Sequence, residues 1–148
     1  MAGHNSSVLK RKQLITHYPL ERVTLLGITS TLRAYKLAWL INQAAGLMLA
    51  QAAVLDWEAA GQVVHFLFET EHCTFRLVKN KVVTGEEDKA AYLFSDLKYV
   101  DFFFAVQDLT ETFDVDVLCR TLRTTTGVAY ISQLDLKAYV DRAHFFFH

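Results

Sequence analysis

The sequence has few cysteines and few residues that break regular structure. Its 148 residues include two cysteines, Cys73 and Cys119, one proline and six glycines. Because 52% of the residues are apolar, the chain can build a full hydrophobic core without a disulfide, and no signal peptide indicates secretion. We therefore expect both cysteines to be buried free thiols in a reducing compartment, and the protein to be cytoplasmic.

An excess of charge of either sign is also lacking. The chain has 15 Lys and Arg against 16 Asp and Glu, which gives a net charge of −1. This balance disfavours a protein that binds nucleic acid through a generally basic surface. The charges are unevenly distributed, because residues 1–40 carry six positive side chains and one negative, whereas residues 81–148 carry seven positive and eleven negative.

One long run without charge is present, but its composition excludes a membrane span. Residues 37–55 contain no charged side chain, yet they include Asn42, Gln43, Gln51 and Gly46 and are rich in alanine. Membrane spans are dominated instead by Leu, Ile, Val and Phe. We therefore expect no membrane association.

The spacing of apolar residues predicts one α+β domain over residues 1–148, with residues 1–12 as a flexible leader. Apolar residues at steps of three and four predict helices over 31–46 and 110–123, whereas alternating or continuous apolar runs predict strands. The nearly continuous run Val100–Val106 predicts a central strand that is covered on both faces. Together these elements predict a two-layer sandwich, with a mostly antiparallel sheet of five to six strands, two main helices on one face and a C-terminal helix after Asp135.

Phenylalanine is used in an unusual way. Six of the eleven phenylalanines form two consecutive triplets. Because successive side chains of a strand point to opposite faces, the first triplet places rings on both sides of the sheet, and each side needs a cover. A second copy of the protein is one such cover, so the sequence predicts a homodimer whose interface draws on Phe102, Phe103, Phe104, Phe145, Phe146 and Phe147.

The segment Phe94–Phe102 carries a resemblance to a known family. Its sequence is Phe-Ser-Asp-Leu-Lys-Tyr-Val-Asp-Phe. It resembles the signature of the IPExxxVDY family, a bacterial group of small uncharacterised proteins, with Val100 and Asp101 matching and Phe94, Ser95, Asp96 and Phe102 replacing the other signature residues. The resemblance implies kinship over residues 24–134 and no particular activity.

Two interpretations of this segment remain open. Ser95 or Asp96 can accept backbone hydrogen bonds in a turn that leads into the central strand, which is a structural role. Alternatively, Asp96 and Asp101 form a carboxylate pair for acid–base chemistry or for a cation.

Other candidate chemistry is sparse. His65, His72 and Cys73 are the nearest approach to a metal cluster, but they lack the spacing of a zinc site. The glycines form no phosphate-binding loop. We therefore predict no catalytic residue, no cofactor and no metal site.

The basic residues near the start of the chain suggest a polyanion contact. Lys10, Arg11, Lys12, Arg33 and Lys36 could neutralise phosphates, and the neighbouring aromatic side chains could stack on bases. Tyr35 and Trp39, however, lie four residues apart in the predicted helix, and this spacing is more often found in a core. The sequence thus favours a non-catalytic protein-interaction or regulatory module that self-associates. The alternatives are an RNA-binding or ribosome-associated accessory protein and, third, an enzyme of unknown class.

Overall fold

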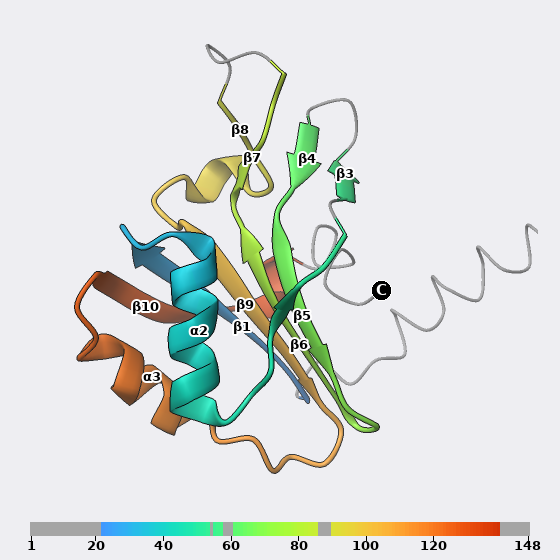
Figure 1. Cartoon of the computed structure of the whole chain (residues 1–148), viewed down its shortest axis with the longest axis vertical. Coiled ribbons are helices and arrows are strands. Elements are labelled where there is room, and N and C mark those ends of the chain that lie inside the picture. The colour runs from blue at the N-terminus through green and yellow to red at the C-terminus, as the bar shows by residue number, and fades with distance from the viewer. Residues whose placement is uncertain (1–21, 54, 58–60, 86–89, 140–148) are drawn as a thin grey trace, which may run out of the picture.

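The centre of the protein is a six-stranded antiparallel sheet (Figure 1). The computed structural model describes residues 22–53, 55–57, 61–85 and 90–139. The strands of the sheet, from one edge to the other, are β10 (Val128–Leu134), β1 (Val23–Ser30), β9 (Phe102–Asp108), β6 (Cys73–Lys79), β5 (His65–Glu69) and β2 (Ala50–Gln51). The predicted central strand is confirmed, because β9 lies between β1 and β6.

Two short hairpins extend one end of the sheet (Figure 1). One pairs β3 (Leu55–Trp57) with β4 (Gly61–Val63), and the other pairs β7 (Lys81–Val82) with β8 (Ala91–Tyr92). Backbone hydrogen bonds between Gln62 and Val83 join the two hairpins. The 3-10 helix η2 (Ser95–Leu97) then leads from β8 back to the sheet.

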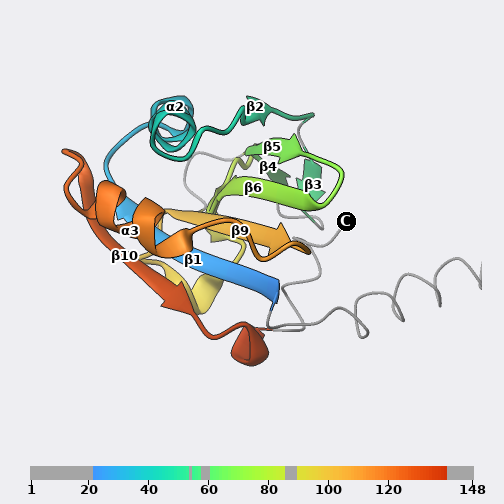
Figure 2. The ribbon, with the colours of Figure 1, turned by 90° about the horizontal axis from the view of Figure 1, so that it is seen from below.

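Both α-helices of the described residues cover the same face of the sheet, as predicted (Figure 2). Helix α2 (Ala34–Ala45) buries Leu37, Ala38 and Ile41 and ends at Gly46, whose left-handed φ of 67° suits glycine. Helix α3 (Val115–Arg123) begins at Asp114, whose carboxylate accepts a hydrogen bond of 3.1 Å from the backbone N–H of Val117.

The sheet has a hydrophobic core on each face. The core under the helices contains Phe102 and Phe104, and the core on the opposite face contains Phe103 together with Phe94 and Leu97. Only 2%, 0% and 0% of Phe102, Phe103 and Phe104 is exposed, because the chain itself covers both faces of β9. These three rings therefore form no exposed surface. Phe145, Phe146 and Phe147 lie outside the described residues.

The prediction of a C-terminal helix after Asp135 is wrong for the described residues. Within the described residues, only a 3-10 helix, η3 (Leu136–Tyr139), follows β10. Asp135 stabilises this short turn, because its carboxylate accepts from the N–H of Lys137 and its carbonyl accepts from the N–H of Ala138, both at 3.1 Å. A bond over three residues builds a 3-10 turn rather than an α-helix.

The segment β9–α3–β10 connects two parallel strands around a third. Both β9 and β10 are antiparallel to β1, which lies between them. The turn into β10 contains Gly127, where a Cβ atom would come within 2.7 Å of Leu32. Gly127 also accepts hydrogen bonds through its carbonyl from the hydroxyl of Ser30 and the N–H of Thr31.

Among the described residues, no helix is long and apolar enough to cross a bilayer.

Candidate functional site

The turn that carries the family-like signature is held by one buried side chain, Asn80. Its amide nitrogen donates to the carbonyls of Leu97 and Val100 at 2.9 and 2.8 Å. Its amide oxygen accepts from the N–H of Phe94 at 3.0 Å. Asn80 is 0% exposed, so this turn has a fixed position relative to the end of β6.

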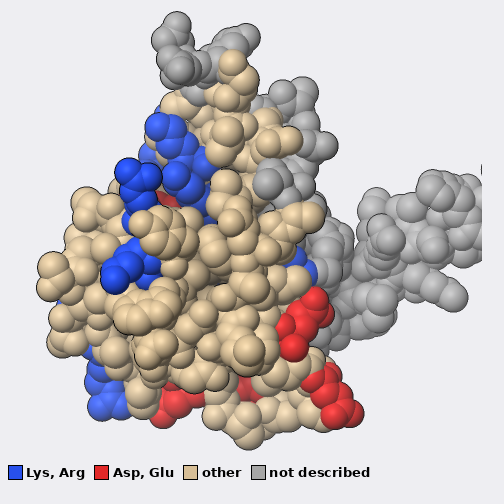
Figure 3. All heavy atoms as spheres, in the orientation of Figure 1, with Lys and Arg blue, Asp and Glu red and all other residues tan. Residues whose placement is uncertain are grey.

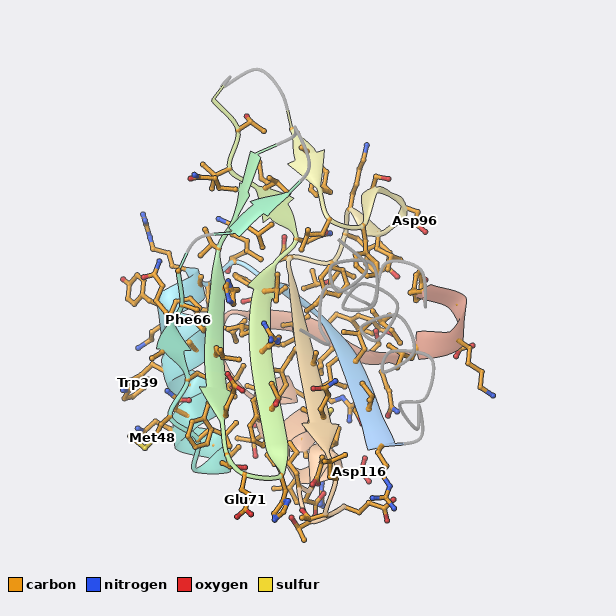
Figure 4. All side chains as sticks on the ribbon, turned by 90° about the vertical axis from the view of Figure 1, so that its right-hand side faces the viewer. Trp39, Met48, Phe66, Glu71, Asp96 and Asp116 are labelled. Carbon is orange, nitrogen blue, oxygen red and sulfur yellow. The ribbon has the colours of Figure 1, made fainter. Side chains whose placement is uncertain are left out.

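Asp101 connects the same turn to β1. Its Oδ2 accepts a hydrogen bond of 2.8 Å from the backbone N–H of Ser30, and its own N–H donates to the carbonyl of Ile28 at 2.9 Å. Thr29 adds a bond of 2.8 Å from its hydroxyl to the carbonyl of Tyr99. Asp96 is exposed on η2 (Figure 4). The carboxylate of Asp101 therefore has a structural role at this junction.

Beside this junction lies a hollow with a basic lining. Its volume is about 340 Å³, and Lys79, Lys81 and Lys98 contribute its three positive charges. The other lining residues are Ser30, Leu32, Tyr92, Val100, Asp101 and Phe102. We call this the basic hollow.

Several elements converge to build the basic hollow. Lys79 lies at the end of β6 opposite Phe102, and Lys81 lies opposite Tyr92 in the β7–β8 pair. Lys98 follows η2, and its ammonium lies 5.7 Å from the centre of the Tyr92 ring. Among the described residues, none of the three lysines forms an ion pair. With one carboxylate against three ammonium groups, the lining attracts anions.

Aromatic side chains are exposed on the neighbouring helix α2. Tyr35 is 66% exposed and Trp39 52% exposed, so the expectation that they belong to the core is wrong. The helix packs through Leu37, Ala38 and Ile41 and leaves both rings on its outer side, where Figure 4 shows Trp39. The ammonium of Lys36 lies 4.7 Å from the centre of the Trp39 ring.

The basic hollow and the outer side of α2 belong to one face of the molecule. Leu32 lines the hollow, and α2 begins two residues later at Ala34. Figure 3 shows lysine and arginine side chains gathered over the end of this face where β7, η2 and the start of α2 lie. In the same view most of the acidic surface lies toward the other end, and a small acidic patch lies among the basic side chains.

Sequence reasoning found only part of this face. Arg33 and Lys36 are exposed at the start of α2, as a polyanion contact requires, whereas Lys10, Arg11 and Lys12 lie outside the described residues. Val100, Asp101 and Phe102 of the signature line the basic hollow. The lysines of the hollow were missed, although a signal was present in the sequence Lys79-Asn80-Lys81 at a turn between two strands.

The cysteines and histidines do not assemble a reactive group. Both thiols are free, and burial raises the pKa of each. The thiol of Cys73 also donates a hydrogen bond of 3.2 Å to Asp108, which raises its pKa further. In the part of the chain that the structure describes, no three His, Cys, Asp or Glu side chains are grouped so that they could hold a metal ion.

Asp108 is a second organising carboxylate that sequence reasoning missed. Its Oδ1 accepts from the N–H and the hydroxyl of Thr110 at 3.0 and 2.7 Å, and its Oδ2 accepts from the N–H of Phe113 at 2.7 Å. Burial alone would raise the pKa of this carboxyl, but the hydrogen bonds outweigh burial and hold the pKa well below its ordinary value. The loop that they fix includes Glu111, which has a positive φ of 55°.

The chain thus folds as an α+β protein with a basic hollow and an exposed aromatic helix on one face. Comparisons with protein-family models, with curated proteins and with solved structures found no match. The resemblance of residues 94–102 to the IPExxxVDY signature stays a prediction.

Proposed function

We propose that this protein is a non-catalytic module that binds single-stranded RNA. The observation that carries the proposal is the basic hollow, where three lysines converge without an ion pair among the described residues. Lysines usually project separately into solvent, because their mutual repulsion and hydration favour separation. Three that surround one hollow are well placed to neutralise the phosphates of a strand.

The aromatic side chains of α2 support a single strand rather than a duplex. Tyr35 and Trp39 are exposed beside Lys36 on the helix that starts next to the hollow. Unpaired bases stack on such rings, and stacking contributes about 1–3 kcal/mol per base. A strand that places its backbone at the hollow and its bases on α2 would use both features. A cytoplasmic location, as the sequence predicts, is compatible with an RNA ligand.

A binding role suits the hollow better than a catalytic one. Its one carboxylate, Asp101, already accepts a hydrogen bond from the backbone of Ser30. Proton transfer would require that group to be available to a substrate. The ammonium groups of the lysines, in contrast, form no ion pair within the described residues.

The test is the salt dependence of binding to a labelled oligouridine, measured by fluorescence anisotropy. Replacing Lys79, Lys81 and Lys98 with alanine should reduce the magnitude of the negative slope of log affinity against log salt by about 2. Each neutralised phosphate of a single strand contributes about 0.7 to this magnitude. The matched control replaces Arg120, Arg123 and Lys137, which are exposed elsewhere, and changes the net charge equally. Equal effects of the two triple variants, or no binding by the wild type, would refute the proposal.

Self-association is the second candidate function, and the edge strand β10 favours it. Within the described residues, β10 pairs only with β1, so its outer edge has unpaired backbone groups. Val128–Leu134 contains no charge and no proline, although these are the usual protections of an edge against pairing. Antiparallel pairing of two copies about Ile131 would extend the sheet across a dimer.

The mass of the protein in solution tests this second function. Light scattering at high micromolar concentration should give a dimer, and Ile131→Pro, which removes a backbone donor from the edge strand, should give a monomer. Because Ile131 is also buried, Tyr130→Lys provides a second variant that alters only an exposed edge residue. A monomeric wild type would contradict the dimer and would leave the RNA proposal intact.

A further inference from the structure

The deepest part of the basic hollow is formed by buried residues that have no side-chain donor to spare. Ser30, Val100 and Phe102 line the hollow and are all buried. Val100 and Phe102 have apolar side chains, and the hydroxyl of Ser30 already donates to the carbonyl of Gly127 at 2.6 Å. A ligand therefore enters from the side of the lysines, and their ammonium groups are the donors that it meets.

The three lysines surround the hollow from separate elements. Lys79 comes from the end of β6, Lys81 from the β7–β8 hairpin, and Lys98 from the residue after η2. The ring of Tyr92, which also lines the hollow, lies 5.7 Å from the ammonium of Lys98, a distance at which the ring attracts a cation. Because the lysines converge on one volume of about 340 Å³, they suit a single anionic group better than a row of successive phosphates.

The charge of the lining indicates which kind of phosphate fits. Three lysines and Asp101 give the lining a net charge of +2. Each internal phosphate of a strand carries one negative charge, whereas a phosphate monoester carries about 1.5–2 negative charges at pH 7 and three acceptor oxygens. The monoester thus matches the net charge of the lining and gives each ammonium group an oxygen of its own.

We propose that the basic hollow binds a terminal phosphate monoester of the RNA strand. The inference rests on the proposed function and names the part of the strand that enters the hollow. A terminal phosphate is joined to the strand on one side only, so it can enter a hollow whose deepest part is closed by buried residues. The following nucleotides can then reach the start of α2, where Arg33, Tyr35 and Lys36 are exposed.

The experiment compares the ends of the strand by isothermal titration calorimetry with the full chain. The ligands are unlabelled oligouridines of one length with a 5′-phosphate, with a 3′-phosphate or with hydroxyl groups at both ends. One phosphorylated end should bind about tenfold or more tightly than the hydroxyl ends, because hydrogen bonds between charged groups are strong. The end that gains affinity identifies the source of the monoester. A hydroxyl-ended oligouridine one nucleotide longer adds a charge without a monoester and should gain much less.

Single substitutions locate this effect in the hollow. Lys81 and Lys98 are exposed, so Lys81→Ala and Lys98→Ala should fold like the wild type, which circular dichroism checks. Each should reduce the advantage of the phosphorylated end severalfold. Arg120→Ala, at an exposed position of α3, removes the same charge elsewhere and should keep that advantage. An equal advantage in all three variants would overturn the proposal.

The failure of this inference and the failure of RNA binding give different results. Equal affinity for the phosphorylated and the hydroxyl-ended oligouridines would overturn the terminal-phosphate site and leave RNA binding intact. If no oligouridine binds, the RNA proposal fails, and uridine 5′-monophosphate and uridine 3′-monophosphate test the hollow by itself. Saturable binding of either mononucleotide that is lost in Lys98→Ala would support a monoester site, whereas no binding of either would overturn it.

Discussion

The backbone N–H of Ser30 donates a hydrogen bond of 2.8 Å to Oδ2 of Asp101, a residue 71 positions away in the sequence. This bond joins the end of β1 to the beginning of β9, and both residues line the basic hollow. The carboxylate therefore holds the wall of the hollow while its negative charge opposes the binding of an anion. These two effects can be separated by mutation.

Asp101→Asn should bind oligouridine more tightly than the wild type and remain folded. The asparagine oxygen can still accept from Ser30, but the negative charge beside the three lysines is gone. Asp101→Ala should lower the free energy of unfolding by about 1–3 kcal/mol, because the N–H of Ser30 loses its partner in a part-buried position. Urea unfolding and anisotropy measure the two effects. Weaker RNA binding by Asp101→Asn would contradict the assignment of the hollow as the phosphate site.

Asn80→Ala should lower the free energy of unfolding more than Asp101→Ala does. The change leaves the carbonyls of Leu97 and Val100 and the N–H of Phe94 without their side-chain partner in the protein interior. A loss of roughly 2–4 kcal/mol in the free energy of unfolding is expected, since each unpaired buried group costs about 1–3 kcal/mol. The carbonyl of Val100 and the N–H of Phe94 lose their partner, whereas the carbonyl of Leu97 keeps the N–H of Val100. Gln43→Ala, at an exposed position of α2, is the control and should change stability little. Equal stability of the two variants would refute the role of Asn80.

The sequence pattern predicted the central strand well, for a clear physical reason. A strand covered on both faces needs no polar alternation, and residues 100–106 have almost none. The strand itself is Phe102–Asp108, displaced by two residues, because Asn80 and Ser30 bind Val100 and Asp101 in the preceding turn. These partners are far away in the sequence, so no local pattern could have fixed the boundary.

The face that carries the basic hollow and the exposed rings of α2 was harder to predict. A spacing of four residues places Tyr35 and Trp39 on one side of a helix, but it does not say whether that side faces the sheet. The side of α2 that faces the sheet carries Leu37, Ala38 and Ile41 instead. The lysines of the hollow come from β6, β7 and the residue after η2, and the pairing of β7 with β8 together with the hydrogen bonds of Asn80 brings them to one place.

The carboxylate of Asp108 should make the free energy of unfolding depend on pH below about pH 4. Its pKa is lowered in the folded state, so its contribution is present above the pKa of the unfolded chain, about 3.9, and is lost as the pH falls toward the folded value. Below about pH 4 the wild type should therefore lose stability more steeply than Asp108→Asn. Urea unfolding at several pH values measures the difference. Parallel curves for the two proteins would show that the carboxylate is not stabilised by the folded loop.

Trp39 should report directly on the stacking that the RNA proposal requires. The chain has two tryptophans, so Trp57→Phe leaves Trp39 as the one tryptophan that fluoresces. Its emission should be quenched when oligouridine binds, because a base stacked on the exposed ring provides a path for quenching. In the natural chain, Trp39→Ala should weaken binding by about 1–3 kcal/mol, the contribution of one stacked base. Tyr130→Ala removes an equally exposed ring from β10, 58% against 52% exposed, and should leave affinity unchanged. If RNA binds with the affinity of the wild type when Trp39 is absent, the strand does not follow α2, and the lysines of the basic hollow act without an aromatic platform.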